Sequence, residues 1–199
     1  MRTLDQINFK DQRAVIRVDF NVPLNEKLEV TDPTRIQAAQ PTIQHILAQG
    51  GSCVLISHLG RPKAKDPKLS LGNITNTVAE ILGVPVSFSE HCVGSEAEAL
   101  TAALPAGGVL LTENLRFHEE ETKGDITFAE QLSNLGTVYV NDAFGTAHRA
   151  YASTTIMAQF FEKKCFGKLL EKEVLAIEKV MSNGEAPILA ILCGAKVSS

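Results

Sequence analysis

Short apolar segments alternate with helix-length segments along the whole chain, and this alternation restricts the fold more than any other feature. The apolar segments cover residues 13–19, 52–57, 84–88, 108–112, 137–140 and 187–192. Near-continuous runs of Val, Leu and Ile are typical of parallel strands that are buried on both faces. Parallel strands need crossover helices, which cover both faces of such a sheet. The pattern therefore predicts an α/β fold with a three-layer, doubly wound parallel sheet.

The segments between these strands carry helix signals. Asp32 and Pro33 have the composition of a helix start, and Ser95 with Glu98 has the spacing of a capping box. Residues 168–181 place apolar side chains at helical spacing with charged side chains opposite. The acidic run at residues 119–121, in contrast, is interpreted as a solvated loop.

The predicted organisation has three parts. Residues 1–166 form a lobe, residues 167–182 a linker helix, and residues 183–199 the first strand and turn of a second lobe. The strand at 187–192 is followed by neither a helix nor a partner strand. We therefore expect the chain to stop just inside the second lobe.

Charge and composition exclude several classes of protein. The formal net charge of −4 at pH 7 provides no global positive field for nucleic acid or an anionic membrane. No window reaches the ~18 apolar residues of a membrane span, and the N-terminus lacks the apolar core of a signal peptide. The four cysteines are dispersed without a C-x-x-C pair. These features predict a cytoplasmic protein whose cysteines are free thiols.

Polar residues follow four of the predicted strands, at the edge where open α/β sheets bind ligands. Three of these strand exits contain an arginine, and a further arginine lies in the first turn of a predicted helix, where free amides favour an anion. Guanidinium groups match phosphate and carboxylate oxygens. One such arginine alone is more often a surface charge, but the matching positions favour an anion pocket. The four arginines are Arg35, Arg61, Arg116 and Arg149.

Other polar residues at these exits have two interpretations each. Asp19 and Asn21 can hydrogen-bond their own turn or accept from the hydroxyl of a small polyol acid. His58 and His148 are further donors, although His148 is more often a packed or capping residue. Asp142 has the position of a general base, but its turn context favours a structural role.

Common nucleotide and hydrolase motifs are missing. The sequence has no G-x-x-x-x-G-K-[ST] loop, no strand-linked G-x-G-x-x-G, no H-E-x-x-H and no G-x-S-x-G. A complete nucleotide site is therefore not visible. Lys196, in a small-residue turn after the last predicted strand, is a weak indication of a phosphate site, and an ordinary exposed turn lysine is the alternative.

Taken together, six motifs resemble the phosphoglycerate kinase family in order and spacing, over essentially the whole chain. They are "RVDFNVPL" at 17, "TRIQAAQPTI" at 34, "SHLGRP" at 57, "ENLRFH" at 113, "NDAFGTAHR" at 141 and "GAKVS" at 194. The resemblance implies a Rossmann-like N-terminal lobe of that family. It departs from the family pattern at Cys193 and Ser199, which flank the last motif.

The resemblance also implies functional roles. A set of seven residues would hold 3-phosphoglycerate or 1,3-bisphosphoglycerate: Asp19, Asn21, Arg35, His58, Arg61, Arg116 and Arg149. Arg35 and Lys196 would stabilise the phosphoryl group during its transfer to or from ADP. Lys196 would also contact the nucleotide. Mg-ATP or Mg-ADP would bind mainly to a C-terminal lobe, with no resident metal in this part, and the protein would be a monomer.

Three hypotheses follow. The first is the substrate half of a glycolytic phosphoglycerate kinase, which binds the triose acid but does not turn over alone. The second is a noncatalytic α/β module that binds a phosphorylated metabolite. The third is a doubly wound domain whose arginines are surface charges with no ligand.

Overall fold

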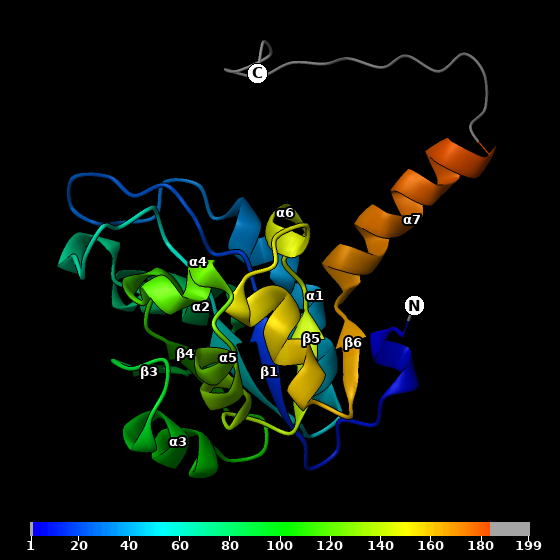
Figure 1. The fold of residues 1–199 in the computed structure, drawn as a ribbon, viewed down its shortest axis with the longest axis horizontal. Helices are drawn as coiled ribbons and strands as arrows, with labels where there is room; N and C mark the ends of the chain where they lie inside the picture. Colours follow the sequence, from blue (N-terminus) through cyan, green and yellow to red (C-terminus); the bar gives the residue numbers. More distant parts are fainter. Residues whose placement is uncertain (1, 184–199) are drawn as a thin grey trace.

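A parallel six-stranded sheet forms the centre of residues 2–183, the part of the chain that the computed structural model describes (Figure 1). Its strand order is β3-β4-β2-β1-β5-β6, and every neighbouring pair is parallel. The strands are β1 (Arg13–Arg17), β2 (Ser52–Ile56), β3 (Val86–Ser89), β4 (Val109–Thr112), β5 (Val138–Asn141) and β6 (Lys164–Phe166). The predicted strand at 187–192 and Lys196 lie outside the described residues.

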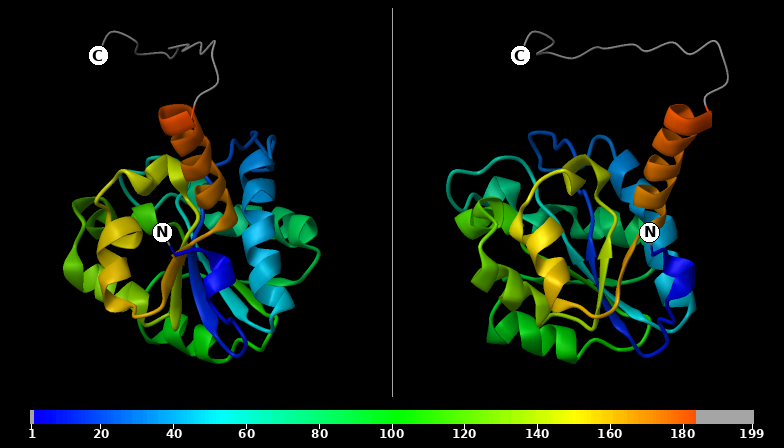
Figure 2. Two further views of the ribbon diagram at one scale, coloured as in Figure 1. Left: turned by 90° about the vertical axis from the view of Figure 1, so that its right-hand side faces the viewer. Right: turned by 45° about the vertical axis from the view of Figure 1, so that its right-hand side comes forward.

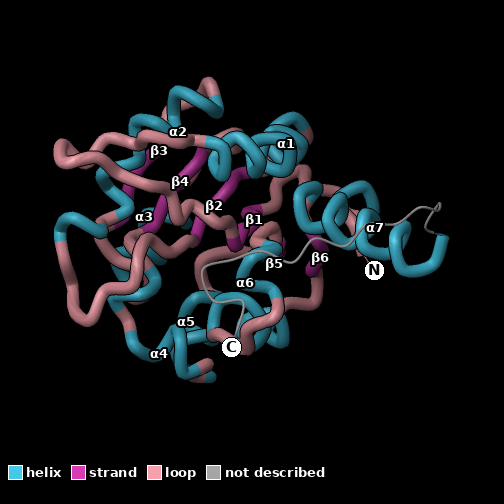
Figure 3. Tube along the Cα trace, turned by 90° about the horizontal axis from the view of Figure 1, so that it is seen from above, coloured by secondary structure: helices cyan, strands magenta, loops and turns pink. Residues whose placement is uncertain are grey.

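Helices cover both faces of the sheet, so the predicted three layers and double winding are confirmed (Figures 2 and 3). One face packs on α1 (Thr34–Ala48) and α2 (Thr75–Leu82). The other face packs on α3 (Ser95–Ala102), α5 (Ile126–Ser133) and the turns η5 (Ala152–Ile156) and η6 (Met157–Phe160). Successive strand residues therefore enter different cores: Ile16 packs with α1 and Val15 with α5.

Shorter elements and one long helix complete the described chain. They are η1 (Leu4–Gln6), η2 (Pro67–Leu69), η3 (Leu71–Ile74), η4 (Leu115–Phe117), α4 (Glu119–Lys123), α6 (Phe144–Ala147) and α7 (Lys168–Asn183). Helix α7 is the helix that was predicted at 168–181, and it projects from the body of the sheet (Figure 1).

All five predicted strands that fall within the described residues are strands, with ends within two residues of the prediction. Strand β6 was not predicted because it has only three residues and begins at the exposed Lys164, so it carries no apolar run. It pairs with β5 and also forms a bridge from Phe166 to Thr3. Strand β3 is the opposite edge strand, and its Ser87 is exposed, unlike the central strands.

Both helix starts predicted from the sequence differ by one residue from those in the structure, because Pro33 is the N-cap of α1 and Thr34 its first helical residue. Asp32 Oδ1 accepts a hydrogen bond from Thr34 N at 2.9 Å, at the start of α1. The capping box predicted for Ser95 is wrong, because Ser95 is already the first helical residue. Gly94, with φ of +94°, precedes α3 and caps it without a side chain.

The acidic run is a helix and not the predicted solvated loop. Residues 119–123 form α4, in which Lys123 Nζ lies 2.9 Å from Glu119 Oε2. Glu121 is on the inner side of this helix and only 1% exposed. Its burial depends on partners far away in the sequence, which local charge patterning does not reveal.

The cysteines that the structure describes fit the prediction. Cys53, Cys92 and Cys165 are free and buried, and burial raises the pKa of each thiol. Cys193 lies outside the described residues. Among residues 2–183, no helix combines the length and the apolar character needed to cross a bilayer.

Candidate anion-binding site

The strand order reverses next to β1, and a cavity opens at this edge of the sheet. From β1 the chain passes to β2 and onwards to β3 and β4, and then returns to β5 on the other side of β1. Ligands of open α/β sheets bind at such a reversal, outside the carboxyl ends of the strands. The cavity there has a volume of about 780 Å³. Its lining consists of Asp19, Asn21, Arg35, His58, Arg61, Pro62, Lys63, Ala64, Arg116, Phe117, His118, Glu119, Thr122, Gly145, Thr146, His148, Arg149 and Tyr151.

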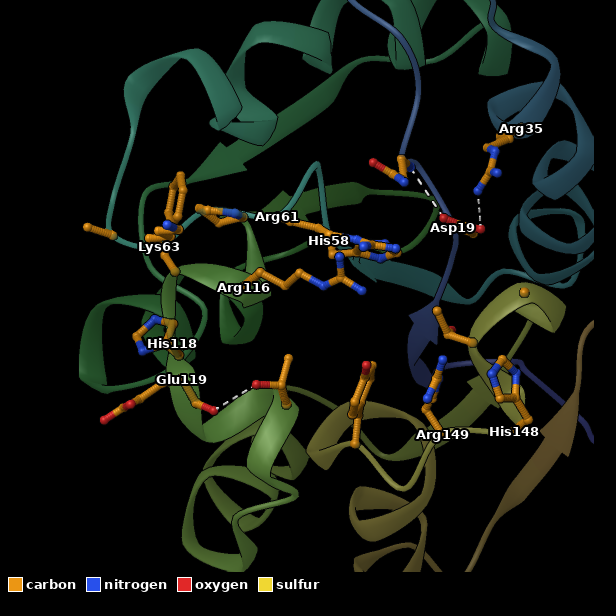
Figure 4. Close-up of a pocket in the computed structure, with 18 residues that line it drawn as sticks. Asp19, Arg35, His58, Arg61, Lys63, Arg116, His118, Glu119, His148 and Arg149 are labelled. Carbon is orange, nitrogen blue, oxygen red and sulfur yellow. Dashed lines mark hydrogen bonds and ion pairs between the residues drawn. The ribbon is translucent and has the colours of Figure 1, made fainter. Parts of the chain in front are cut away.

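The structure places all seven predicted ligand residues in the lining of this one cavity. They come from the loops after β1, β2, β4 and β5 and from the first turn of α1, and Figure 4 shows their side chains around a common space. His148, the further donor considered from the sequence, also lines it. The separate strand exits thus meet, as parallel topology requires.

The lining is strongly cationic in an acidic protein. It contains five permanently charged cations and only two carboxylates, those of Asp19 and Glu119. The fifth cation, Lys63, was not singled out from the sequence. It follows Arg61 by two residues in the same loop, which is the signal that could have identified it. An excess of cations in one concave surface favours an anionic ligand.

Both carboxylates are already paired, Glu119 with Lys123 of its own helix and Asp19 with Arg35. Asp19 Oδ2 forms an ion pair with Arg35 Nη1, and Asp19 Oδ1 accepts from Asn21 N at 3.3 Å. The Arg35 side chain is 51% exposed, so its remaining donors face solvent and the cavity (Figure 4). Asp19 therefore orients Arg35, in addition to any contact it makes with a ligand.

The backbone N–H and carbonyl of Gly60 connect three loops of the site. Its N–H donates to Asn21 Oδ1 at 2.8 Å, and its carbonyl accepts from Arg116 Nη1 at 2.7 Å. Gly60 has φ of +64°, and a Cβ there would lie 2.8 Å from Leu69 Cδ2. Only glycine fits this turn without displacement. The loop after β2 is thereby fixed against those after β1 and β4.

Asn114 strengthens the same junction. Its Nδ2 donates to the carbonyls of Leu59 and Leu69, both at 2.8 Å, and its Oδ1 accepts from Leu59 N at 3.2 Å. Oδ1 also accepts from Arg116 N at 3.0 Å. A fully buried amide with satisfied donors and acceptors makes the loop geometry specific. This role of Asn114 was not predicted, since its partners lie up to 55 residues away.

His58 is neutral in this cationic environment. It is buried, and burial together with the charges of Arg17 and Arg116 lowers its pKa to about 2. The buried Arg17 donates from Nη2 to His58 Nδ1 at 3.2 Å. His58 therefore acts as a hydrogen-bonding group and adds no charge to the cavity.

The arginines of the cavity crowd one another. Burial, and the neighbouring charges of Arg17 and Arg61, lower the pKa of Arg116, which nevertheless stays protonated as arginines do. Arg61 and Arg149 are exposed at the mouth of the cavity (Figure 4). An anion that binds between these arginines offsets the repulsion between their positive charges.

Asp142 lies outside the lining. It is completely buried, and its Oδ1 accepts from Leu169 N at 3.0 Å and Leu170 N at 3.1 Å, in the first turn of α7. This is the structural role that the turn context favoured, and it leaves no contact with the cavity. Burial raises the pKa of Asp142 to about 6.

Residues 2–183 contain no cluster of three or more His, Cys, Asp or Glu side chains that could hold a metal ion. Lys196 lies outside the described residues, so its predicted contact with a transferring phosphoryl group stays a prediction.

Comparisons with known proteins agree on one family. A family model described as phosphoglycerate kinase matches residues 4–199. The cytosolic phosphoglycerate kinase of Triticum aestivum is 46% identical over 197 residues, covering 99% of this chain and 49% of that protein. The chloroplastic phosphoglycerate kinase 1 of Arabidopsis thaliana is 46% identical over 196 residues, covering 98% and 41%.

A solved structure is similar as well. The crystal structure of phosphoglycerate kinase from Pyrococcus horikoshii matches with a TM-score of 0.85 at 30% identity, covering 94% of this chain and 47% of that one. The chain spans about half the length of the curated relatives it matches.

Proposed function

The chain belongs to the phosphoglycerate kinase family, and from this premise we propose that its cationic cavity binds 3-phosphoglycerate and 1,3-bisphosphoglycerate. The reaction it would serve is phosphoryl transfer between 1,3-bisphosphoglycerate and ADP, which yields 3-phosphoglycerate and ATP in glycolysis. The residues proposed to hold the triose acid are Asp19, Asn21, Arg35, His58, Arg61, Arg116 and Arg149.

The observation that carries this proposal is the gathering of five cations around one cavity at the strand reversal. A triose acid with a phosphate at one end and a carboxylate or acyl phosphate at the other needs charge-assisted donors at both ends. Arginines from three separate loops and the start of a helix can contact both ends at once. A hydroxyl between the two ends would meet Asp19, Asn21 and His58.

The chemistry fits a site with arginines and no general base. In the direction of ATP formation, an oxygen of ADP attacks the acyl phosphate, the bond from phosphorus to the carboxylate oxygen breaks, and a carboxylate leaves. In reverse, that carboxylate attacks and is already ionised at pH 7, so no proton has to be removed. Positioning and charge stabilisation then supply most of the catalysis. We propose Arg35 and Lys196 as the groups that stabilise the transferring phosphoryl group.

The nucleotide would enter the reaction as Mg-ADP or Mg-ATP. We propose that Lys196 contacts it and that a C-terminal lobe of the kind present in the full-length relatives supplies most of its site. A monomeric, cytoplasmic protein is proposed on the same family premise, although the relatives include both cytosolic and chloroplastic proteins.

Titration calorimetry of the chain with 3-phosphoglycerate tests the proposal. We expect saturable binding, and loss of at least about a hundredfold in affinity when Arg61→Glu and Arg116→Glu are combined, because two charge-assisted contacts become repulsions. The control is Lys10→Glu, a charge reversal just before β1, at the opposite edge of the sheet. Absence of binding by the folded wild-type chain, or unchanged binding by the double variant, would contradict the proposal.

A coupled assay of ATP formation from 1,3-bisphosphoglycerate and ADP addresses turnover. The prediction from the sequence is binding without turnover by the 199-residue chain. Binding separates the first two hypotheses from the third. The same assay on a longer form with a nucleotide-binding half separates the first two, because the noncatalytic module also binds but has no kinase activity in any longer form. The domain with surface arginines alone binds nothing.

A further inference from the structure

A chain of buried hydrogen bonds runs from the helix α4 to the ligand cavity, through residues that line the cavity only at its end. We propose that Glu121 is a positioning residue for His58 and that it acts through Ser153 and Arg17 to fix His58 as a hydrogen-bond donor to the bound anion. The proposal rests on the proposed function in one respect, the identity of the anion. The contacts that carry it do not depend on that identity.

The first link joins Glu121 to Ser153, which are 1% and 0% exposed. Ser153 Oγ donates to Glu121 Oε1 at 2.6 Å, and Ser153 N donates to Glu121 Oε2 at 2.9 Å. Both carboxylate oxygens are therefore occupied by the same residue. Ser153 lies in the π-helical turn η5, and such turns recur at functional sites. The single hydroxyl proton of Ser153 is committed to the carboxylate.

The second link joins Ser153 to Arg17. With its proton committed, Ser153 Oγ offers its lone pairs, and Arg17 Nε donates to it at 2.8 Å. Arg17 is 1% exposed, and no described carboxylate lies within ion-pair distance of its guanidinium. An uncompensated buried charge is costly. Glu121, one serine away, supplies the opposite charge and holds the guanidinium plane through the serine.

The third link, from Arg17 to His58, determines the tautomer of the His58 ring. Arg17 Nη2 lies 3.2 Å from His58 Nδ1. A guanidinium has donors and no acceptor, so Nδ1 must carry the lone pair and the neutral ring must carry its proton on Nε2. The lowered pKa of His58, caused by burial and by the surrounding arginines, agrees with a neutral ring.

The direction of the donor matters for an anionic ligand. His58 lines the cavity together with Arg61 and Arg116 (Figure 4). With Nδ1 facing Arg17, the other ring nitrogen is the one available to the cavity, and in this tautomer it donates. The opposite tautomer would present a lone pair to a phosphate or carboxylate oxygen and an N–H to the guanidinium, both repulsive.

A purely structural role for Glu121 makes a different prediction. In that case the Glu121 network would stabilise the fold, and its loss would lower the melting temperature without changing the protonation of His58. The tautomer of His58 is therefore the readout that separates positioning from stabilisation. It is measured in the ligand-free chain, so it stays informative even if 3-phosphoglycerate does not bind.

The experiment uses long-range 1H–15N NMR spectra of the histidine rings in the ¹⁵N-labelled chain at pH 7. We expect one His58 species with an unprotonated Nδ1 and a protonated Nε2. An imidazolium, or a ring protonated on Nδ1, in the wild-type chain would overturn the proposal. His58 is assigned by its loss from the spectrum of the His58→Gln variant.

Ser153→Ala removes the hydroxyl link and little volume. We expect the His58 signals to shift toward a mixture of tautomers, and the affinity for 3-phosphoglycerate to fall about fivefold, the value of one oriented hydrogen bond. Glu121→Gln, which keeps the shape but places an amide N–H against a donor, should act in the same direction. If only one of the two variants folds, that one decides.

The matched control is Ser89→Ala. Ser89 is also completely buried and donates through Oγ to His91 O at 2.8 Å, but it lies at the end of the edge strand β3. It should leave the His58 spectrum and the affinity unchanged. A folded Ser153→Ala or Glu121→Gln variant that keeps the single wild-type tautomer would overturn the proposal. A shifted tautomer in a chain that binds no 3-phosphoglycerate would instead contradict only the proposed function.

Discussion

At the scale of single residues, the candidate site depends on hydrogen bonds that hold arginines before any ligand arrives. Arg116 donates to the Gly60 carbonyl, and Arg35 is paired with Asp19. Both guanidinium groups keep further donors for an anion, because a guanidinium has five. Such contacts reduce the side-chain entropy lost on binding.

Arg116→Ala should weaken binding of 3-phosphoglycerate by about ten- to a hundredfold, since one charge-assisted interaction contributes about 1.5–3 kcal/mol. Titration calorimetry measures the change. The control is Lys10→Ala, which removes a cation from the opposite edge of the sheet. Equal affinities of the two variants would show that Arg116 does not contact the ligand.

At the scale of elements, the start of α7 is held by two neighbouring elements. Asp142, after β5, accepts from Leu169 N and Leu170 N, and Thr42 Oγ1 in α1 accepts from Lys168 N at 2.9 Å. Three of the amides that a helix leaves free at its N-terminus are thereby bound. The direction in which α7 leaves the sheet is thus set by side chains.

Asp142 should make the stability of the chain depend on pH. Its pKa is raised to about 6 in the folded state, so the folded chain binds the proton more tightly than the unfolded chain. The contribution of protonated Asp142 is complete below about pH 4 and is lost as the pH rises through about 6. Relative to Asp142→Asn, the wild-type free energy of unfolding should fall by on the order of 2 kcal/mol between pH 4 and pH 7.

Urea denaturation of wild type and Asp142→Asn at several pH values measures this difference. Comparing the two proteins removes the contributions of the other carboxyl groups, including Asp32, whose pKa is lowered by its hydrogen bonds with Thr34. A constant difference across the range, or a wild type that gains stability over the variant as the pH rises, would contradict the account.

Gly167, directly before α7, should tolerate no side chain. A Cβ at this position would lie 2.3 Å from Asp142 Cγ. Overpacking of this kind costs about 1–3 kcal/mol, and here it would also displace the acceptor of two helix amides. We expect Gly167→Ala to lower the melting temperature, and Gly167→Ala combined with Asp142→Gly to recover part of the loss. Equal melting temperatures of wild type and Gly167→Ala would show that this contact is not tight.

The elements that the sequence predicted are those whose cause is local. The central strands have continuous apolar runs, and α1 follows Asp32, whose Oδ1 accepts from Thr34 N at 2.9 Å. Strand β6 was not predicted, because its three residues carry no apolar run and form a strand only through their pairing with β5. Likewise, the burial of Glu121 follows from Ser153, 32 residues away.

At the scale of the whole molecule, the strand order explains why the site could be predicted before its geometry was known. In a parallel sheet, all carboxyl ends lie on one edge, so arginines that follow different strands must share that edge. The arginine types and positions were therefore sufficient for Arg61, Arg116 and Arg149. The buried support, through Arg17, Asn114 and the Gly60 peptide, could not be predicted because it depends on tertiary contacts.

The distribution of charge over the molecule gives a further prediction. The chain has a formal net charge of −4, yet the cavity holds five cations and two carboxylates. Attraction of a multivalent anion to this surface is screened by salt. The dissociation constant of 3-phosphoglycerate should rise several-fold as sodium chloride increases from about 50 mM to about 300 mM, as measured by calorimetry. An affinity independent of salt would indicate binding elsewhere or by uncharged contacts.

NMR mapping of the arginine side chains shows whether guanidinium groups from separate loops bind one phosphorylated acid together. The Nε–Hε signals of ¹⁵N-labelled chain are followed during titration with 3-phosphoglycerate. We expect saturable shifts with one common dissociation constant for Arg35, Arg61, Arg116 and Arg149. We expect no shift for Arg13, whose guanidinium donates to the Leu135 and Thr101 carbonyls. Shifts that are spread over unrelated arginines, or that leave the four cavity arginines unchanged, would contradict this prediction.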